Sequence, residues 1–208
     1  MNDDHAITVR RAGRDDLVRA ARVLGDAFKD EPWTRWTVDG RDHQRRVEGL
    51  QFLALEHVGF PYGEVWVAEV AGTIESVAVW MHSDRAVPDA VWAATAGPQA
   101  SLAGDRHEAA LAAQDLVSMA HPLSRHLYLA TIGTRGPWSG RGLGTAVLHQ
   151  GLARADADGL PAFLETSTED NVRFYEAFGF VVTDEIAIPG GPIVWTMLRP
   201  AATAGSPR

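Results

Sequence analysis

Apolar and polar residues follow two different periods along this chain, and the changes between them predict where helices and strands lie. Seven short segments are rich in β-branched, apolar or aromatic residues, as strands are: 7–11, 65–70, 74–81, 126–134, 162–166, 180–188 and 193–198. Between them, helical spacing of apolar residues predicts helices over 17–28, 41–58, 88–120, 142–156 and 169–177. We expect Pro32 to end the first helix, and Gly97-Pro98 and Gly104 to interrupt the third.

This order of elements predicts a mixed α/β (α+β) sheet in one domain over residues 1–200. The segment 126–134 is apolar on both faces, so we expect it to be a central strand. The tail 201–208 is small and polar, and we expect it to be disordered.

Composition narrows the classes of function. The net charge of −8 disfavours nucleic acid as a partner, and no apolar run approaches the roughly 20 residues of a membrane span. The polar start of the chain does not resemble a secretory signal, so we expect a cytoplasmic protein. There is no cysteine, and none of the eight histidines has metal-ligand spacing; His121 and His126 have no acid near them in sequence. We therefore predict no metal.

Charge is unevenly distributed. Residues 116–155 contain no Asp or Glu but carry Arg125, Arg135, Arg141 and Arg154. This window indicates either a local site for an anion or a set of buried elements that carry few acids, and the pattern alone favours neither.

The strongest local signal is a glycine-rich turn between a predicted strand and a predicted helix, Ser139-Gly140-Arg141-Gly142-Leu143-Gly144. Glycines let a ligand approach the backbone, and a helix start offers unpaired N–H groups to phosphate. A Walker A loop is excluded because no Lys follows. A Rossmann turn is incomplete, because Thr145 replaces its third glycine, although Glu165 lies about 20 residues on. A turn without any ligand also remains open.

Two motifs together resemble the GNAT superfamily of N-acetyltransferases. Ser139-x-x-Gly142-x-Gly144 is similar to the family's Q/R-x-x-G-x-G/A turn, apart from Ser at the first position, and 171–180 is similar to its N-x-x-x-Y-x-x-x-G-F segment. The resemblance implies a mostly antiparallel twisted sheet of six to seven strands, with helices on both faces and a splay between strands four and five. It also implies that acetyl-CoA is bound by Ile132, Thr134, Ser139, Gly140, Arg141, Gly142, Leu143, Gly144, Thr145 and Asn171.

Within that family, the chain is similar to the members that acetylate the α-amine of puromycin, an aminoacyl-nucleoside antibiotic. The similar segments are 34–35, 65–69, 78–80, 129–133, 140–148 and 161–167. The acceptor would then be a small-molecule amine, and the chain a monomer or homodimer. Another amine, such as a peptide N-terminus, and a non-catalytic acyl-CoA sensor remain as alternatives.

The resemblance assigns chemistry to particular residues. Tyr175 would be the general acid, although a core tyrosine packed on neighbouring phenylalanines is the alternative. Glu165 is a candidate base or ammonium ligand because it lies in an apolar strand, or else it pairs with an arginine. The candidate acceptor residues are Asp30, Trp33, Arg35 and Trp36. Without a cysteine to carry the acetyl group, we expect direct attack in a ternary complex.

Overall fold

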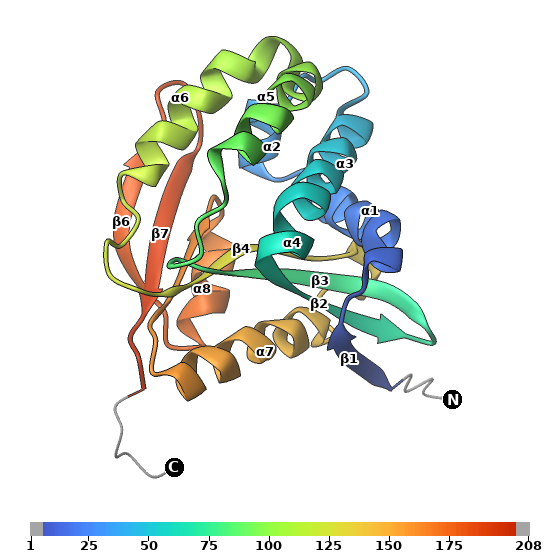
Figure 1. Ribbon diagram of the computed structural model, residues 1–208, viewed down its shortest axis with the longest axis vertical. Helices are drawn as coiled ribbons and strands as arrows, with labels where there is room; N and C mark the ends of the chain where they lie inside the picture. Colours follow the sequence, from blue (N-terminus) through green and yellow to red (C-terminus); the bar gives the residue numbers. More distant parts are fainter. Residues whose placement is uncertain (1–5, 203–208) are drawn as a thin grey trace.

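The computed structural model describes residues 6–202 and contains a seven-stranded sheet in the order β1-β2-β3-β4-β5-β7-β6 (Figure 1). The strands are β1 (Ile7–Arg11), β2 (Gly63–Val70), β3 (Thr73–His82), β4 (Leu127–Thr134), β5 (Ala162–Thr166), β6 (Val181–Ala187) and β7 (Ile193–Arg199). Every neighbouring pair is antiparallel except β4 and β5. The expected mixed, mostly antiparallel sheet is confirmed, with β4 at its centre. Residues 203–208 of the expected tail lie outside the described residues.

Helices cover both faces of this sheet, as Figure 1 shows. They are α1 (Leu17–Phe28), α2 (Pro32–Thr37), α3 (His43–Ala54), α4 (Phe60–Tyr62), α5 (Asp89–Ala103), α6 (His107–Ser118), α7 (Leu143–Asp158) and α8 (Glu169–Glu176). Helices α1, α3 and α4 lie on one face, and α7 lies on the other. Helix α6 extends over the β6–β7 end of the molecule, and α5 packs against α3 and α6.

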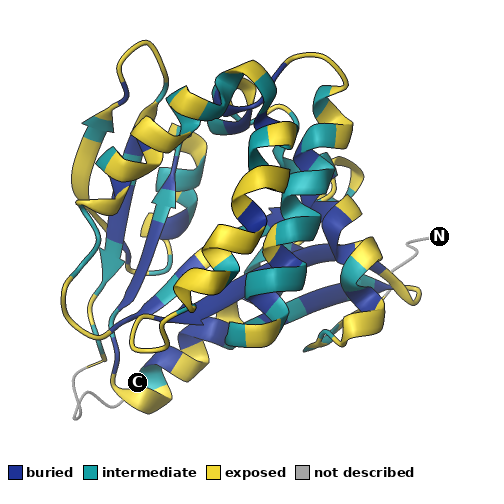
Figure 2. Ribbon diagram, turned by 45° about the horizontal axis from the view of Figure 1, so that its top comes forward, coloured by how far each residue is buried: buried dark blue, intermediate teal, exposed yellow. Residues whose placement is uncertain are grey.

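The period-two alternation of β3 produces this layered arrangement. Val77 and Val79 point into the cluster that contains Leu24 of α1, whereas Ala78 and Trp80 point into the cluster that contains α7. Figure 2 shows the strands buried between the two helical layers. A Cβ at Gly151 would lie 2.0 Å from the Trp80 ring, so the glycine lets α7 pack closely on the sheet.

Three sequence predictions about helices are corrected by the structure. Pro32 does not end α1, which stops at Phe28; it begins α2, where a proline at the first position costs no backbone hydrogen bond. Helix α5 continues through Gly97-Pro98, whereas the expected break at Gly104 is confirmed: α5 ends at Ala103, and Gly104 has a φ of +66°. The predicted helix 41–58 begins only at His43 and, after α3, continues as the π-helical turn Leu55–Gly59.

The sheet opens between β4 and β5, as the family resemblance implied. Only Leu127, Tyr128 and Leu129 of β4 pair with β5, so the rest of β4 has no strand partner on that side. On its other side, Thr131 pairs with Val79 and Leu129 with Trp80, which leaves Ala130 as an extra residue in a β-bulge. A bulge bends a strand and increases its local twist. The bulge therefore lies where β4 turns away from β5.

Candidate functional site

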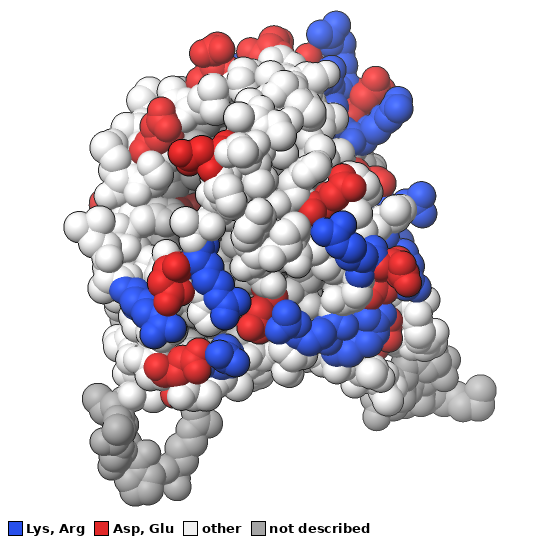
Figure 3. Space-filling view, in the orientation of Figure 1, with Lys and Arg blue, Asp and Glu red and all other residues white. Residues whose placement is uncertain are grey.

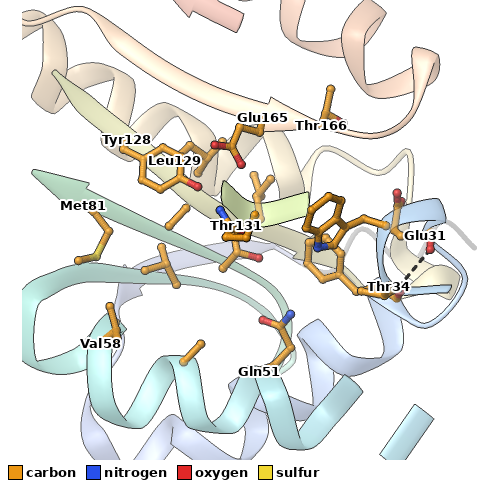
Figure 4. Close-up of a pocket in the computed structure, with 18 of the residues that line it drawn as sticks. Glu31, Thr34, Gln51, Val58, Met81, Tyr128, Leu129, Thr131, Glu165 and Thr166 are labelled. Carbon is orange, nitrogen blue, oxygen red and sulfur yellow. Dashed lines mark hydrogen bonds between the residues drawn. The ribbon is translucent and has the colours of Figure 1, made fainter. Parts of the chain in front are cut away.

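A cavity of about 360 Å³ lies at this opening, on the α1 and α3 side of the sheet (Figure 4). Ala130, Thr131 and Ile132 of β4 form one edge, and Glu165 and Thr166 of β5 form the other. The remaining wall comes from α1, α2, α3, the π-helical turn, β3, α5, α6, α8 and β7. The aromatic residues of the whole lining are Phe28, Trp33, Trp92, Tyr128 and Tyr175. The volume and the mainly apolar lining with a few polar groups are typical of a small-molecule site.

Tyr175 reaches the cavity from the opposite helical layer. Its ring packs edge-on against Phe174 and Phe180 in the α7-side core, yet it lines the cavity together with Asn171, one turn earlier in α8. The cavity thus connects with the α7 side of the sheet through the gap. Burial, together with the charge of Glu31, raises the pKa of the Tyr175 hydroxyl, which therefore keeps its proton. Tyr175 therefore packs on phenylalanines as a core tyrosine would, and it also lines the cavity, as a general acid must.

Glu165 is paired, but not with an arginine. Its carboxylate contacts Nε2 of His121, which corrects the expectation that this histidine has no acid nearby. The carboxylate also lies beside the Tyr128 side chain (Figure 4). Burial, with the charge of Glu165, raises the pKa of the Tyr128 hydroxyl. Three polar side chains thus meet at the β5 edge of the cavity.

Three acids at the C-terminal end of α1, Asp26, Asp30 and Glu31, lie in three different environments. Asp26 binds Lys29 at 2.8 Å, which lowers the pKa of its carboxyl, and Asp30 is exposed outside the cavity lining. Glu31 lines the cavity, and burial raises the pKa of its carboxyl (Figure 4). The acid that faces the cavity is therefore Glu31, next to the candidate Asp30.

The candidate acceptor residues from α2 point in different directions. Trp33 lines the cavity, and so does Trp92 of α5. Arg35 is exposed and lies outside the lining. Trp36 also lies outside it: its indole N–H donates to the Gly190 carbonyl at 2.6 Å, and the Arg106 guanidinium lies 4.8 Å from its ring centroid. Of the four candidates Asp30, Trp33, Arg35 and Trp36, the structure places only Trp33 at the cavity.

The glycine-rich turn leaves a row of backbone amides without acceptors. Gly140 and Gly142 have φ of +73° and +86°, and a Cβ at either position would meet nothing within 4 Å. The first hydrogen bond of α7 runs from the Ala146 amide to the Gly142 carbonyl, and no side chain caps this helix. Among residues 6–202, the amides of Gly140 and 142–145 therefore have no partner. Such an open helix start can bind a phosphate group.

Three of the four arginines of the acid-free window pair with acids outside it. Arg125 binds Asp84, Arg135 binds Glu75 and Arg154 binds Asp158. Figure 3 shows charges of both signs mixed over one face of the molecule. Within the described part of the chain, no carboxylate pairs with Arg141, whose guanidinium lies 5.0 Å from the Trp138 ring centroid, next to the open amides.

The other predicted CoA contacts lie along β4 and the turn. Ile132 lines the cavity, whereas the Thr134 hydroxyl bonds Ser76 at 2.8 Å and faces Gly144. Leu143 is buried in the α7-side core, Ser139 precedes the open amides, and Thr145 belongs to the first turn of α7.

Sequence reasoning missed His121, Tyr128, Glu31 and Thr131 as site residues. His121 is 44 residues from Glu165, so no local spacing joins them. Thr131 lines the cavity with a buried hydroxyl that has no partner among the described residues. Its place beside the bulge is a property of strand pairing that one sequence does not show. Only Glu31 had a signal in the sequence: with Asp26 and Asp30, it puts negative charge at the C-terminal end of a helix, where the helix dipole disfavours it.

Within residues 6–202, no group of three or more His, Asp or Glu side chains is arranged to hold a metal ion. In the same range, no helix combines the length and the apolar character that crossing a membrane requires.

Comparison with known proteins extends these observations. The model of the acetyltransferase (GNAT) family matches residues 26–180. A Corynebacterium glutamicum structure described as histone acetyltransferase HPA2 and related acetyltransferase is 25% identical, with a TM-score of 0.75 over 97% of this chain and 99% of that one. A Drosophila melanogaster polyamine N-acetyltransferase has 16% identity and a TM-score of 0.62, over 93% and 99% of the two chains. Arylalkylamine N-acetyltransferase 2 from Aedes aegypti has 11% identity and a TM-score of 0.61, over 93% and 98%.

Proposed function

This chain belongs to the GNAT acetyltransferase family and is an acetyl-CoA-dependent N-acetyltransferase, and from that premise we propose that its acceptor is the free α-amine of an aminoacyl-nucleoside such as puromycin. The observation that carries the proposal is the cavity at the β4–β5 gap, where Tyr175 and Glu165 line one space. Acetyl-CoA supplies an activated acyl group as a thioester. The open amides of α7 and Arg141 would hold its diphosphate, and the unpaired side of β4 would bind its pantetheine arm.

The two sides of the gap have separate chemical tasks. A model α-amine has a pKa near 8, so a fraction is already neutral at pH 7 and needs only modest help from a base. The amine nitrogen forms a bond to the acetyl carbon and gives a proton to the Glu165 carboxylate. The carbon–sulfur bond breaks, and Tyr175 gives its proton to the departing thiolate. Both residues line the same cavity, which supports their proposed roles as base and acid at one reacting centre.

Two features support an aminoacyl-nucleoside as the acceptor. Trp33, Trp92, Phe28 and Tyr128 give the cavity flat apolar walls that suit aromatic groups. Segments along most of the chain, including 129–133 and 161–167, are similar to puromycin N-acetyltransferase. The second of these segments contains Glu165, and the first contains the bulge residue Ala130.

A panel of amines tests the acceptor. Thiol release from acetyl-CoA is measured with puromycin, with N-acetylated puromycin as the blocked control, and with agmatine, spermidine and an alanyl peptide. We expect puromycin to give a kcat/KM at least about 100-fold above that of the other amines, because a site that matches one substrate rejects amines that leave its groups unpaired. Turnover that is equal for all amines, or greater for another one, would reject the aminoacyl-nucleoside acceptor while leaving the acetyltransferase intact.

One observation favours a second acceptor class. Glu31 and Glu165 both line the cavity, and two carboxylates suit a dicationic amine. The variant Glu31→Gln separates the classes. For a diamine acceptor, KM rises about 10-fold because one charge pair is lost. For puromycin, which has one α-amine to be acetylated, KM stays within about 2-fold.

A further inference from the structure

His121 lies behind the proposed base, outside the cavity. It follows α6, and its Nε2 atom contacts Oε1 of Glu165. Glu165 lines the cavity, whereas His121 does not, and 29% of the His121 side chain is exposed. The carboxylate therefore stands between the cavity and an imidazole that solvent can reach.

Aromatic neighbours fix the plane of this imidazole. The His121 ring packs edge-on against Tyr128 of β4 at 5.1 Å between centroids, and against Phe163 of β5 at 4.8 Å. The His121 amide donates to the Ser118 carbonyl at 3.2 Å, and Pro122 follows directly. A ring held by two strands and by its own backbone is a pre-organised hydrogen-bond donor.

We propose that His121 is a positioning residue for acetyl transfer, which holds the Glu165 carboxylate in the orientation that accepts the amine proton. This inference rests on the proposed role of Glu165 as the base. His121 donates its Nε2–H to one carboxylate oxygen, and the Tyr128 ring packs on the imidazole and lies beside the same carboxylate. These contacts fix the rotamer of a side chain that would otherwise swing between cavity and solvent.

The arrangement gives His121 a role different from that of Tyr128. Tyr128 is itself part of the cavity wall, so its removal changes the shape of the acceptor site as well as the carboxylate. His121 touches the reaction only through Glu165. Its loss should therefore lower kcat, while the acceptor and acetyl-CoA still bind with unchanged KM.

Two variants at one position test this. In His121→Leu the donor is lost, and we expect kcat to fall about 10- to 100-fold, the value of a hydrogen bond to a charged group, with both KM values within about 2-fold. In His121→Gln the amide nitrogen lies near the place of Nε2, and we expect at least about half of kcat to return. The control His149→Leu makes the same change at an exposed position of α7, and should keep full activity.

A double-mutant cycle separates positioning from general stabilisation. In the Glu165→Gln background, His121→Leu should lower kcat by less than about 2-fold further, because the residue through which it acts is already altered. Equal losses in both backgrounds would overturn the proposal, as would an unchanged kcat in His121→Leu or no recovery in His121→Gln. Thermal unfolding of each variant shows whether it is folded, and His121→Gln is read against wild type if His121→Leu does not fold.

The same data distinguish the two proposals. If wild type releases no thiol with any amine, the proposed function fails before the variants are compared. If wild type is active and Glu165→Gln keeps full kcat, the base assignment fails. If Glu165→Gln is impaired but His121→Leu is not, only the positioning role of His121 fails.

Discussion

At the scale of single residues, Tyr175 belongs both to the hydrophobic core and to the cavity wall. It is 5% exposed and packs with Phe174 and Phe180, but it also lines the cavity through the β4–β5 gap. Burial raises the pKa of its hydroxyl, so the group stays protonated and can act as a proton donor next to a departing thiolate.

Replacement of Tyr175 by Phe tests the acid directly. We expect kcat for thiol release to fall about 100-fold or more, since a positioned acid contributes about that much, while KM for acetyl-CoA changes less than about 2-fold. Tyr62→Phe is the matched control, because it removes a tyrosine hydroxyl from a residue that does not line the cavity. Full turnover in Tyr175→Phe would remove this residue from the mechanism.

The pH profile follows from the direction of the Tyr175 shift. An acid with a raised pKa keeps its proton to a higher pH, so no loss of activity should accompany the ordinary tyrosine pKa near 10. From about pH 6 to about pH 9, kcat/KM should rise as the α-amine, with a pKa near 8, loses its proton. Initial rates in overlapping buffers measure this. A fall below about pH 9 that is absent in Tyr175→Phe would contradict it.

A site residue could be predicted from the sequence when the residues it acts with are close to it along the chain. Asn171 and Tyr175 are one helical turn apart, and the structure places both at the cavity. Glu165 stood out because it is an acid in an apolar strand. Its neighbours His121 and Tyr128 did not, since β4, α7 and β5 must fold before these residues meet.

At the scale of elements, the junction of β4 and α7 depends on backbone conformation more than on side chains. Gly140 and Gly142 hold positive φ and leave open space in front of the amides. The sequence predicted this turn because glycine is the residue that adopts such angles without strain. It did not predict α2, because Pro32 was expected to end a helix and instead occupies the first position of one, where proline is tolerated. Nor did it predict the continuity of α5, where packing outweighs the breaking tendency of Gly97-Pro98.

Gly142→Ala tests the phosphate cradle. A Cβ at φ +86° costs roughly 1 kcal/mol of strain and displaces the amides, so we expect CoA to bind about 10-fold more weakly by calorimetry. Gly159→Ala is the control, because Gly159 has φ +62° at the other end of α7 and meets the same strain away from the cradle. Equal loss of CoA affinity in both variants would show that strain alone, and not the cradle, matters.

At the scale of the whole molecule, the two parts of the sheet diverge where the reaction is proposed to take place. Strands β1 to β4 and strands β5 to β7 share only three parallel residue pairs, which leaves room for two substrates to approach from different sides. The sequence predicted the seven strands and, through the family resemblance, the splay. The bulge at Ala130 and the cavity wall contributed by α5 and α6 could not be predicted from the sequence, because they arise from long-range packing.

A partly buried ion-pair network joins β1, β2 and the start of α1, and it makes stability depend on pH. Arg10 binds Asp16 at 2.6 Å and Glu69 at 2.5 Å, and this lowers the pKa of Asp16 to about 2 from an ordinary 3.8. A lowered carboxyl pKa contributes stability above the unfolded value, and the contribution is lost as pH falls from 3.8 through 2. Asp16→Asn should therefore lower the free energy of unfolding by about 1–2 kcal/mol at pH 7, allowing for the partly exposed Arg10.

Urea denaturation of both proteins at pH 7 and pH 2.5 checks this. The difference between wild type and Asp16→Asn should shrink at the lower pH, because protonation of Asp16 there removes part of the same interaction. A difference that stays constant or grows toward acid would show that charge pairing at Asp16 does not stabilise the fold.

The central claim is that a thioester held beside α7 and an amine held in the cavity meet directly at the β4–β5 gap. Initial velocities of thiol release over a matrix of acetyl-CoA and puromycin concentrations test it most directly. The double-reciprocal lines should intersect, with one thiol released for each N-acetyl product, because both substrates must be bound together. Parallel lines, which indicate an acetylated enzyme intermediate, or no thiol release with any amine, would contradict it.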